Sequence, residues 1–306
     1  MTSSGGRLER VLRSGRFCVT AEVVPPRSAD GSAVTEQARA LVGYADAVNV
    51  TDNPTAHAHM SPLAGVSLVA AAGLEPTLQI NSRDRNRLAV TSDLLGGWAL
   101  GARNLLCLTG DPVSVGDHPE AKPVYDLAIL DLIRLAAALR EEGRMLSGAT
   151  IEAPPRYFIG VADPPLAEGY TPARLEAKLD AGADFVQTQI VYDVPALAEW
   201  ADGVRGRGIF DRASVLVGVA PLRSAKAARH MQENVPGVVV PESLIEALEE
   251  AGPDSEHEGV RSAVEVVNGL KAIPGIAGVH VMGLGREDAV RRVIEGAGLA
   301  PRPAAV

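Results

Sequence analysis

The sequence predicts an α/β fold of the (β/α)8, or TIM, barrel class, and three observations lead to this prediction. Short runs rich in β-branched residues alternate with longer stretches of helical apolar spacing along almost all of the 306 residues. Most of these runs are continuously apolar, which is typical of parallel strands buried on both faces. Eight such pairs within about 300 residues match the size of one (β/α)8 barrel.

The expected elements follow from this alternation. We expect strands over Phe17–Val23, Asp46–Val50, Glu75–Ile80, Asn104–Thr109, Arg156–Val161, Asp184–Gln189, Ser214–Val219 and Gly278–Met282. We expect helices over Ala33–Leu41, Pro62–Ala72, Arg85–Leu100, Asp126–Glu142, Pro172–Ala181, Pro195–Arg205, Ala225–Glu233 and Arg286–Gly296. An extra helical segment, Glu242–Leu270, precedes the last strand and is interrupted by a loop over Gly252–His257.

A doubly wound parallel sheet is the competing architecture. That fold usually carries a glycine-rich loop after its first strand, whereas VVPPRSADG follows the first strand here. We therefore expect residues 17–299 to form a single barrel, preceded by an N-terminal segment, residues 1–16, and followed by a flexible tail, residues 300–306. Residues 1–6 are also expected to be flexible.

Composition and charge exclude several classes of function. No run of about 18 uncharged apolar residues predicts a membrane span, and the N-terminus carries charges where a signal peptide needs an apolar stretch. We therefore expect a cytoplasmic protein. The net charge of -9 disfavours a general nucleic-acid binder, which needs a basic surface to neutralise phosphates. Nothing in the sequence fixes the oligomeric state, and a homo-oligomer is compatible with it.

The sequence offers no convincing metal site. Cys18 and Cys107 stand in apolar runs without metal-ligand spacing, so reduced thiols in the core are expected. His57 and His59 form an H-x-H pair in a loop, but we find no third ligand nearby. We therefore expect these two histidines to be solvated loop residues.

Polar side chains gather where the first six strands end. Because catalytic residues of (β/α)8 barrels lie at the C-terminal ends of the strands, this set is the candidate site. It comprises Glu22, Thr51, Asp52, Asn53, Gln79, Asn81, Arg83, Thr109, Gly110, Asp111, Asp163, Gln187, Gln189 and Asp193. The last two strands end in mainly apolar residues. Carboxylates and amides in this pattern suit hydrogen-bond recognition of a heterocycle, with one or two carboxylates handling protons.

Two carboxylates are the candidate catalytic residues. Glu22 is one polar residue inside an apolar strand, so it either pairs with an Arg or has a raised pKa suited to a general acid. Asp111 follows Gly110, which allows a ligand to approach the backbone closely, although Asp before Pro112 also forms turns. Both interpretations of each residue remain open at this stage.

The remaining candidates each have a structural alternative. Gln189 can donate and accept hydrogen bonds at the edge of a pterin or flavin, but Gln187 has the same strand face and is its rival. His118 either reaches a cofactor phosphate or faces solvent. Lys178 stands at a helix C-terminus, where the helix dipole alone favours a lysine.

Four segments together resemble the methylenetetrahydrofolate reductase family, over about Phe17 to Leu299. They are A-E-V-V-P-P-R, L-L-C-L-T-G-D-P-V-S-V-G-D-H-P, L-D-A-G-A-D-F-V-Q-T-Q-I-V-Y-D and V-G-V-A-P-L-R-S-A. Within the family the chain looks most like the short, single-domain bacterial type. The resemblance implies a (β/α)8 barrel that carries FAD, takes electrons from NADH or NADPH, and reduces 5,10-methylenetetrahydrofolate to 5-methyltetrahydrofolate.

The resemblance also implies roles for individual residues. Glu22 corresponds to the general acid that opens the five-membered ring, Asp111 lies by the flavin and pterin and binds folate, and Gln189 holds the pterin. Gln79 is a further candidate for the substrate. The positions that match or approximate FAD contacts are Thr51, Thr109, Gly110, Tyr125, Asp163 and Lys178, with His118 as an additional cofactor candidate.

The sequence departs from the family pattern at several ligand positions. Thr109 stands where the family often has Arg, and Ala162 and Ala225 stand where it often has aromatic residues. These changes leave open a reductase that transfers hydride directly without flavin, or one that depends on a partner protein for electrons. A pterin-binding methyltransferase on the same fold is a further alternative, although the strand-one Glu followed by Pro-Pro argues against it.

Overall fold

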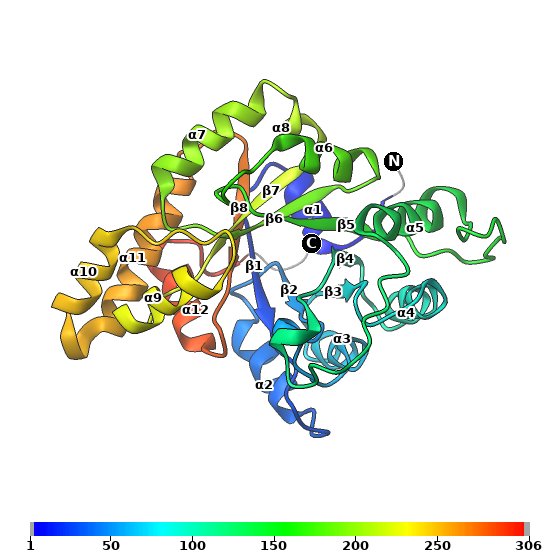
Figure 1. Ribbon diagram of the computed structural model, residues 1–306, viewed down its shortest axis with the longest axis horizontal. Helices are drawn as coiled ribbons and strands as arrows, with labels where there is room; N and C mark the ends of the chain where they lie inside the picture. Colours follow the sequence, from blue (N-terminus) through cyan, green and yellow to red (C-terminus); the bar gives the residue numbers. More distant parts are fainter. Residues whose placement is uncertain (1–2, 303–306) are drawn as a thin grey trace.

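The fold is a closed barrel of eight parallel strands, seen in a computed structural model that describes residues 3–302 (Figure 1). The strands pair in chain order and β8 closes the barrel against β1. They are β1 (Cys18–Val23), β2 (Ala47–Val50), β3 (Pro76–Asn81), β4 (Asn104–Leu108), β5 (Phe158–Asp163), β6 (Phe185–Ile190), β7 (Ser214–Val219) and β8 (Ile276–Val281). The (β/α)8 class predicted from the alternating pattern is confirmed.

Helices surround the barrel, with at least one after each strand, and α1 precedes the first strand (Figure 1). They are α1 (Arg7–Arg13), α2 (Ser32–Leu41), α3 (Pro62–Ala71), α4 (Arg87–Ala99), α5 (Ile129–Glu142), α6 (Pro172–Asp180), α7 (Val194–Arg205), α8 (Ile209–Arg212), α9 (Ala225–Asn234), α10 (Glu242–Glu250), α11 (Ser255–Leu270) and α12 (Glu287–Gly296). Short 3-10 turns are η1 (Pro54–Ala56), η2 (Val113–Val115) and η3 (Gly252–Asp254).

The extra helical segment before the last strand is α10 and α11; α10 packs beside α9, and α11 packs beside α10 and α12 (Figure 1). The loop expected over Gly252–His257 is wrong in its second half. Only the turn η3 separates the two helices, and α11 begins at Ser255. The Gly-Pro pair had indicated a longer break, but here Pro253 stands in the first turn after the helix end, where a missing amide proton costs nothing.

The first helix, which the sequence analysis missed, closes the N-terminal end of the barrel. Leu8, Val11 and Leu12 of α1 pack in one buried cluster with residues from the lower interior of the strands, among them Phe158 and Phe185. The two phenyl rings stack with centroids 5.1 Å apart. This plug leaves the C-terminal end of the barrel as its open end.

Asp46 joins both ends of the chain to the barrel. Its fully buried carboxylate accepts hydrogen bonds from Arg7 (2.9 Å), Arg302 (2.6 Å) and the Val19 amide (3.0 Å). Burial alone raises the pKa of Asp46, but the hydrogen bonds from Arg302 and Val19 outweigh burial and hold it below its ordinary value. Both ends were expected to be flexible, yet Ser4 is buried and Arg302 is bound, while residues 1–2 and 303–306 lie outside the described residues.

Within residues 3–302, no helix is both long and apolar enough to cross a membrane. Cys18 and Cys107 are buried free thiols, as expected from their apolar surroundings.

Replacing Asp46 by Asn is expected to lower the free energy of unfolding by about 3 kcal/mol, because the buried guanidinium of Arg302 then lacks a counter-charge. Urea denaturation near neutral pH measures the change. Asp202→Asn is the matched control, since Asp202 also pairs with an Arg but is 80% exposed, and it should change stability little. Equal effects of the two substitutions would contradict a structural role for Asp46.

Candidate active site

A cavity of about 490 Å³ occupies the open end of the barrel. Its wall is formed by residues at the C-terminal ends of β1 to β6 and β8 and by the loops that follow them. It brings together twelve of the residues that the sequence had singled out: Glu22, Asp52, Asn53, Gln79, Asn81, Thr109, Gly110, Asp111, Asp163, Lys178, Gln187 and Gln189.

Five other candidates do not line this cavity, and one of them is Arg83, which is buried. Thr51 is buried at the end of β2, and its Oγ1 has no hydrogen-bond partner. Tyr125 is 40% exposed in the loop before α5, and His118 is exposed beside a separate cavity of about 120 Å³. Asp193, which was expected in the polar ring, instead caps α7 by accepting a hydrogen bond from the Ala196 amide.

The fold raises the pKa of the Glu22 carboxyl into the range near neutral pH. Burial raises the pKa of Glu22 to about 7, and the negative charge of Glu287 adds to this rise. A hydrogen bond from the Leu284 backbone opposes the shift but does not cancel it. Its neighbour across β1 and β2 is Asn49, an uncharged amide, and no Arg or Lys pairs with Glu22 among the described residues. The carboxyl can therefore hold or release a proton near neutral pH.

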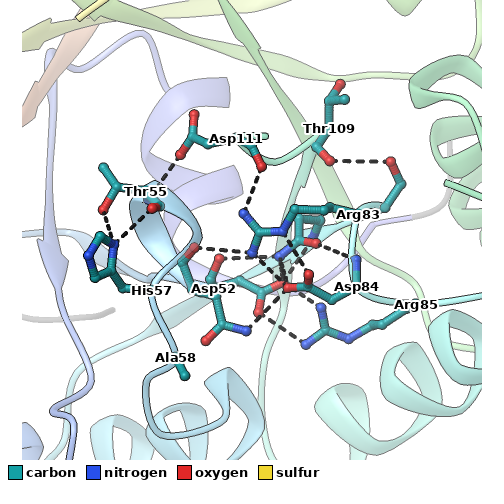
Figure 2. A network of polar contacts seen from close by, with 12 residues as sticks. Asp52, Thr55, His57, Ala58, Arg83, Asp84, Arg85, Thr109 and Asp111 are labelled. Atoms are coloured by element: carbon teal, nitrogen blue, oxygen red, sulfur yellow. Dashed lines mark hydrogen bonds and ion pairs between the residues drawn. The ribbon is translucent and has the colours of Figure 1, made fainter. Parts of the chain in front are cut away.

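Asp111 both faces the cavity and holds a strained loop. One carboxylate oxygen accepts a hydrogen bond from the Thr55 amide at 2.9 Å, and its carbonyl accepts one from Arg83 at 3.0 Å (Figure 2). Thr55 and its neighbours Asn53 and Ala56 have φ angles of 52°, 47° and 57°, a left-handed region that non-glycine residues rarely adopt. Asp111 thus couples the cavity wall to the shape of the loop after β2.

The arginines near the cavity are already paired. Arg85 binds both carboxylate oxygens of Asp52, at 2.7 and 3.0 Å, and Arg83 binds the carboxylate of Asp84 at 2.7 Å (Figure 2). Asn81 completes the network by donating to Asp52 at 2.7 Å. These contacts fix the loops after β2 and β3 and leave little unbalanced positive charge at this side of the cavity.

Lys178 is the cationic side chain among the residues that line the cavity. It lies in the last turn of α6, yet its Nζ is 3.8 Å from Asp163 Oδ1 and donates a hydrogen bond to the Ala162 carbonyl at 2.6 Å. Burial raises the pKa of Asp163, and the charge of Lys178 opposes this rise. The second oxygen of Asp163 is buried without a hydrogen-bond partner. This wall of the cavity therefore offers a ligand one hydrogen-bond acceptor, Asp163, and one cation, Lys178.

The two glutamines of β6 have different surroundings, although both line the cavity. Gln187 is buried and exchanges hydrogen bonds with the Asn49 amide at 2.7 and 3.3 Å. Gln189 lies higher, donating to the Pro236 carbonyl at 3.2 Å and accepting from the Ile190 amide at 3.0 Å. The pairing register of β6 and β7 shifts between Gln187 and Ile190, which sets Gln189 apart from the regular strand.

Sequence reasoning missed His280, which also lines the cavity. It lies in β8, a strand expected to be mainly apolar, and its Nδ1 is 3.0 Å from Thr20 Oγ1. Burial lowers the pKa of His280 to about 4, so the ring is uncharged at neutral pH. In the sequence, the sign of His280 was one polar residue in the apolar run G-V-H-V. The structure shows that this residue faces the interior of the barrel, which is why it reaches the cavity.

The part of the chain that the structure describes holds no group of three or more side chains suited to a metal ion. His57 and His59 contact backbone carbonyls instead, those of Thr55 (2.8 Å) and Pro25 (2.6 Å). Their ring nitrogens thus help to shape the loop after β2.

Comparisons of the sequence with known proteins agree on one family. Residues 7–298 match the family model described as methylenetetrahydrofolate reductase. Methylenetetrahydrofolate reductase 1 of Schizosaccharomyces pombe is 31% identical over 210 residues, which cover 65% of this chain and 32% of that protein. Probable methylenetetrahydrofolate reductase (NADPH) of Caenorhabditis elegans is 23% identical over 313 residues, which cover 96% of this chain and 44% of that protein. The chain spans less than half the length of these relatives.

Among solved structures, an uncharacterised protein from Clostridium thermocellum, described as binding two copies of 5-methyl-5,6,7,8-tetrahydrofolic acid, has the same fold. It superposes with a TM-score of 0.64 at 14% identity, covering 94% of this chain and 96% of that one. Oxaloacetate acetylhydrolase superposes with a TM-score of 0.52 at 14% identity, covering 99% of this chain and 90% of that one. At these identities the two superpositions support the barrel fold alone.

Glu22→Gln is expected to stabilise the protein near pH 8 and to do so much less near pH 5. The folded state holds the Glu22 proton more tightly than the unfolded chain does, since its pKa rises from 4.5 to about 7. Glu22 therefore contributes fully to stability at pH values below its pKa in the unfolded chain. This contribution is lost as the pH rises through its pKa in the folded protein. At high pH the substitution should raise the free energy of unfolding by about 3 kcal/mol.

Urea denaturation at the two pH values measures this difference. Glu233→Gln is the control, because Glu233 is exposed in α9 and should show no such pH dependence. A Glu22→Gln protein that is no more stable than wild type near pH 8 would mean that the carboxyl is not held in its neutral form by burial.

Proposed function

Because the chain belongs to the methylenetetrahydrofolate reductase family, we propose that it reduces 5,10-methylenetetrahydrofolate to 5-methyltetrahydrofolate with hydride from NADH or NADPH. The observation that carries the proposal is Glu22, a carboxyl with a pKa of about 7 at the wall of the barrel cavity. Such a group is half protonated near neutral pH and can act as a general acid.

The proposed role of Glu22 follows from the substrate's chemistry. The bridging carbon of methylenetetrahydrofolate is bonded to two nitrogens, and one of these bonds must break before hydride can add. Protonation of the departing nitrogen by Glu22 allows that bond to break, and leaves an electrophilic iminium carbon at the other nitrogen. Hydride then adds to this carbon to form the methyl group. Glu22 is left as a carboxylate and recovers its proton from solvent.

The remaining polar residues of the cavity orient the pterin in this proposal. Gln189 and Gln79 each carry an amide that can donate and accept, which matches the alternating donors and acceptors of a pterin edge. Asp111 adds a hydrogen-bond acceptor at the mouth of the cavity. Holding the reacting carbon in one orientation toward the hydride donor supplies much of the rate enhancement in such reactions.

The residues of the cavity fit FAD as the cofactor. Asp163 Oδ2 is a buried polar atom without a hydrogen-bond partner in the cavity wall, which a ligand's hydroxyl or amide group can satisfy. Thr51 Oγ1 also lacks a partner, but it lies at the end of β2 outside the lining of the cavity. Lys178 supplies a cation for a diphosphate, and Thr109 and Gly110 offer backbone groups beside it. His118 and Tyr125 stay in the proposed cofactor set at its outer edge. The chemistry that FAD supplies when bound is the storage and transfer of a hydride.

Direct hydride transfer from the nicotinamide, without flavin, is the second candidate. Thr109 and Ala162 line the cavity where the resembled family often has an arginine and an aromatic residue. Both replacements remove contacts that a flavin ring and its phosphates use. A reductase that takes electrons from a partner protein, and a pterin-binding methyltransferase, are tested by the same experiment.

We also propose that residues 17–299 act as one catalytic barrel in the cytoplasm, with small dissolved molecules as partners and no nucleic acid or membrane. The net charge of -9 and the single-barrel core support this proposal. Self-association into a homo-oligomer is compatible with it, and sedimentation would show the oligomeric state.

The cofactor is tested by the absorbance spectrum of the purified protein with and without added FAD. We expect flavin bands that bleach on addition of NADH and return with methylenetetrahydrofolate. NADH loss that depends on folate but shows no flavin band would establish the flavin-free reductase. If neither change occurs, the reductase proposal fails in its simple form and the methyltransferase or partner-dependent alternatives gain support.

Glu22→Gln is expected to slow methylenetetrahydrofolate reduction by at least about 100-fold while NADH binds as in wild type, because removing a general acid typically costs this much. Stopped-flow measurement of folate reduction and titration with NADH separate the two effects. Glu233→Gln should match wild type in both. A Glu22→Gln protein that loses NADH binding and folate reduction equally would show that Glu22 is structural.

A further inference from the structure

His280 lies one layer below Glu22 in the barrel. In the parallel pairing of β1 and β8, Thr20 is the partner of His280, and Glu22 follows two residues later on the same face of β1. Thr20 and His280 are both buried, and His280 also lines the cavity. The imidazole therefore belongs to the floor of the cavity whose wall carries the proposed acid.

The floor consists of uncharged hydrogen-bonding groups that largely satisfy one another. Asn49 and Gln187 pair through their amides at 2.7 and 3.3 Å, and Gln187 Nε2 lies 3.5 Å from Thr20 Oγ1. Thr20 Oγ1 in turn contacts His280 Nδ1 at 3.0 Å. Over residues 3–302, no side chain or backbone group forms a hydrogen bond with the other ring nitrogen, Nε2.

The contact with Thr20 leaves Nε2 available in either tautomer. If the Thr20 hydroxyl donates to the Val279 carbonyl, 3.4 Å away, Nδ1 carries the ring proton and Nε2 is an acceptor. If Thr20 donates to Nδ1, the proton is on Nε2, which is then a donor. In both cases the ring is neutral at pH 7, so it can bind an uncharged polar group without burying an ion.

We propose that Nε2 of His280 hydrogen-bonds an amide-type edge of the bound heterocycle, which makes His280 a further binding residue. An amide-type edge is a carbonyl next to an N–H group. The pyrimidine half of a reduced pterin has one, and so does the carboxamide of a reduced nicotinamide. Such an edge suits either tautomer, because it offers both a donor and an acceptor. This inference rests on the proposed function and adds a residue that the sequence resemblance does not name.

Two substitutions separate binding through Nε2 from a structural role through Nδ1. His280→Asn keeps an amide near the position of Nδ1, within reach of Thr20, and removes the group at Nε2. His280→Gln extends its amide to about the position of Nε2. His230→Asn is the matched control, since His230 is exposed in α9, outside the cavity.

Isothermal titration with 5-methyltetrahydrofolate and, separately, with NADH gives the dissociation constants. We expect His280→Asn to weaken binding of at least one ligand by about tenfold, with a melting temperature close to wild type, and His280→Gln to restore much of the loss. The ligand that responds identifies the source of the amide-type edge. Unchanged binding of both ligands to His280→Asn would overturn the inference, and so would equal losses of stability in both variants with normal binding.

A wild-type measurement keeps the inference testable if the variants fold poorly. The ¹⁵N resonance of His280 Nε2 should shift when 5-methyltetrahydrofolate or NADH is added, and no shift with either bound ligand would overturn the inference. Failure of wild type to bind both ligands would instead contradict the proposed function itself.

Discussion

The raised pKa of the Glu22 carboxyl depends on closure of the barrel. Because β1 pairs with β2 on one side and with β8 on the other, Glu22 has strands on both flanks and loses most of its water. Burial then raises its pKa to about 7, since the surroundings provide amides and hydroxyls rather than a cation. An arginine placed beside Glu22 would stabilise the carboxylate and remove the acid. The uncharged floor of Asn49 and Gln187 therefore helps to keep the pKa of Glu22 raised.

The charged side chains around the barrel form ion pairs at several separate places. The ion pairs of Arg85 with Asp52 and of Arg83 with Asp84 hold the loops after β2 and β3 (Figure 2). Lys178 lies across the barrel on the β5 side, where Asp163 partly balances it. At the other end of the barrel, Asp46 binds the guanidinium groups of Arg7 and Arg302, so segments near both ends of the chain stabilise the fold away from the cavity.

The sequence was most informative where burial imposes a repeating pattern. Continuous apolar runs predicted all eight strands, and strand ends located Glu22, Asp111 and Gln189, because side chains there must line the open end of a barrel. Prediction was weaker where no repeat exists. The long loop after β4 carries His118 and Tyr125 away from the cavity, and loop paths depend on contacts that have no sequence period. His280 was missed because one polar residue in an apolar strand gives no sign of which face it occupies.

The most direct test of this account is the pH dependence of methylenetetrahydrofolate reduction in a single turnover with saturating hydride donor. If Glu22 delivers the proton, the wild-type rate should fall as the pH rises through about 7, the pKa that burial gives this carboxyl. The Glu22→Gln protein should be slow at every pH and should lack that transition. A wild-type rate that stays constant between about pH 6 and 9, or the same transition in Glu22→Gln, would contradict the assignment of Glu22 as the acid.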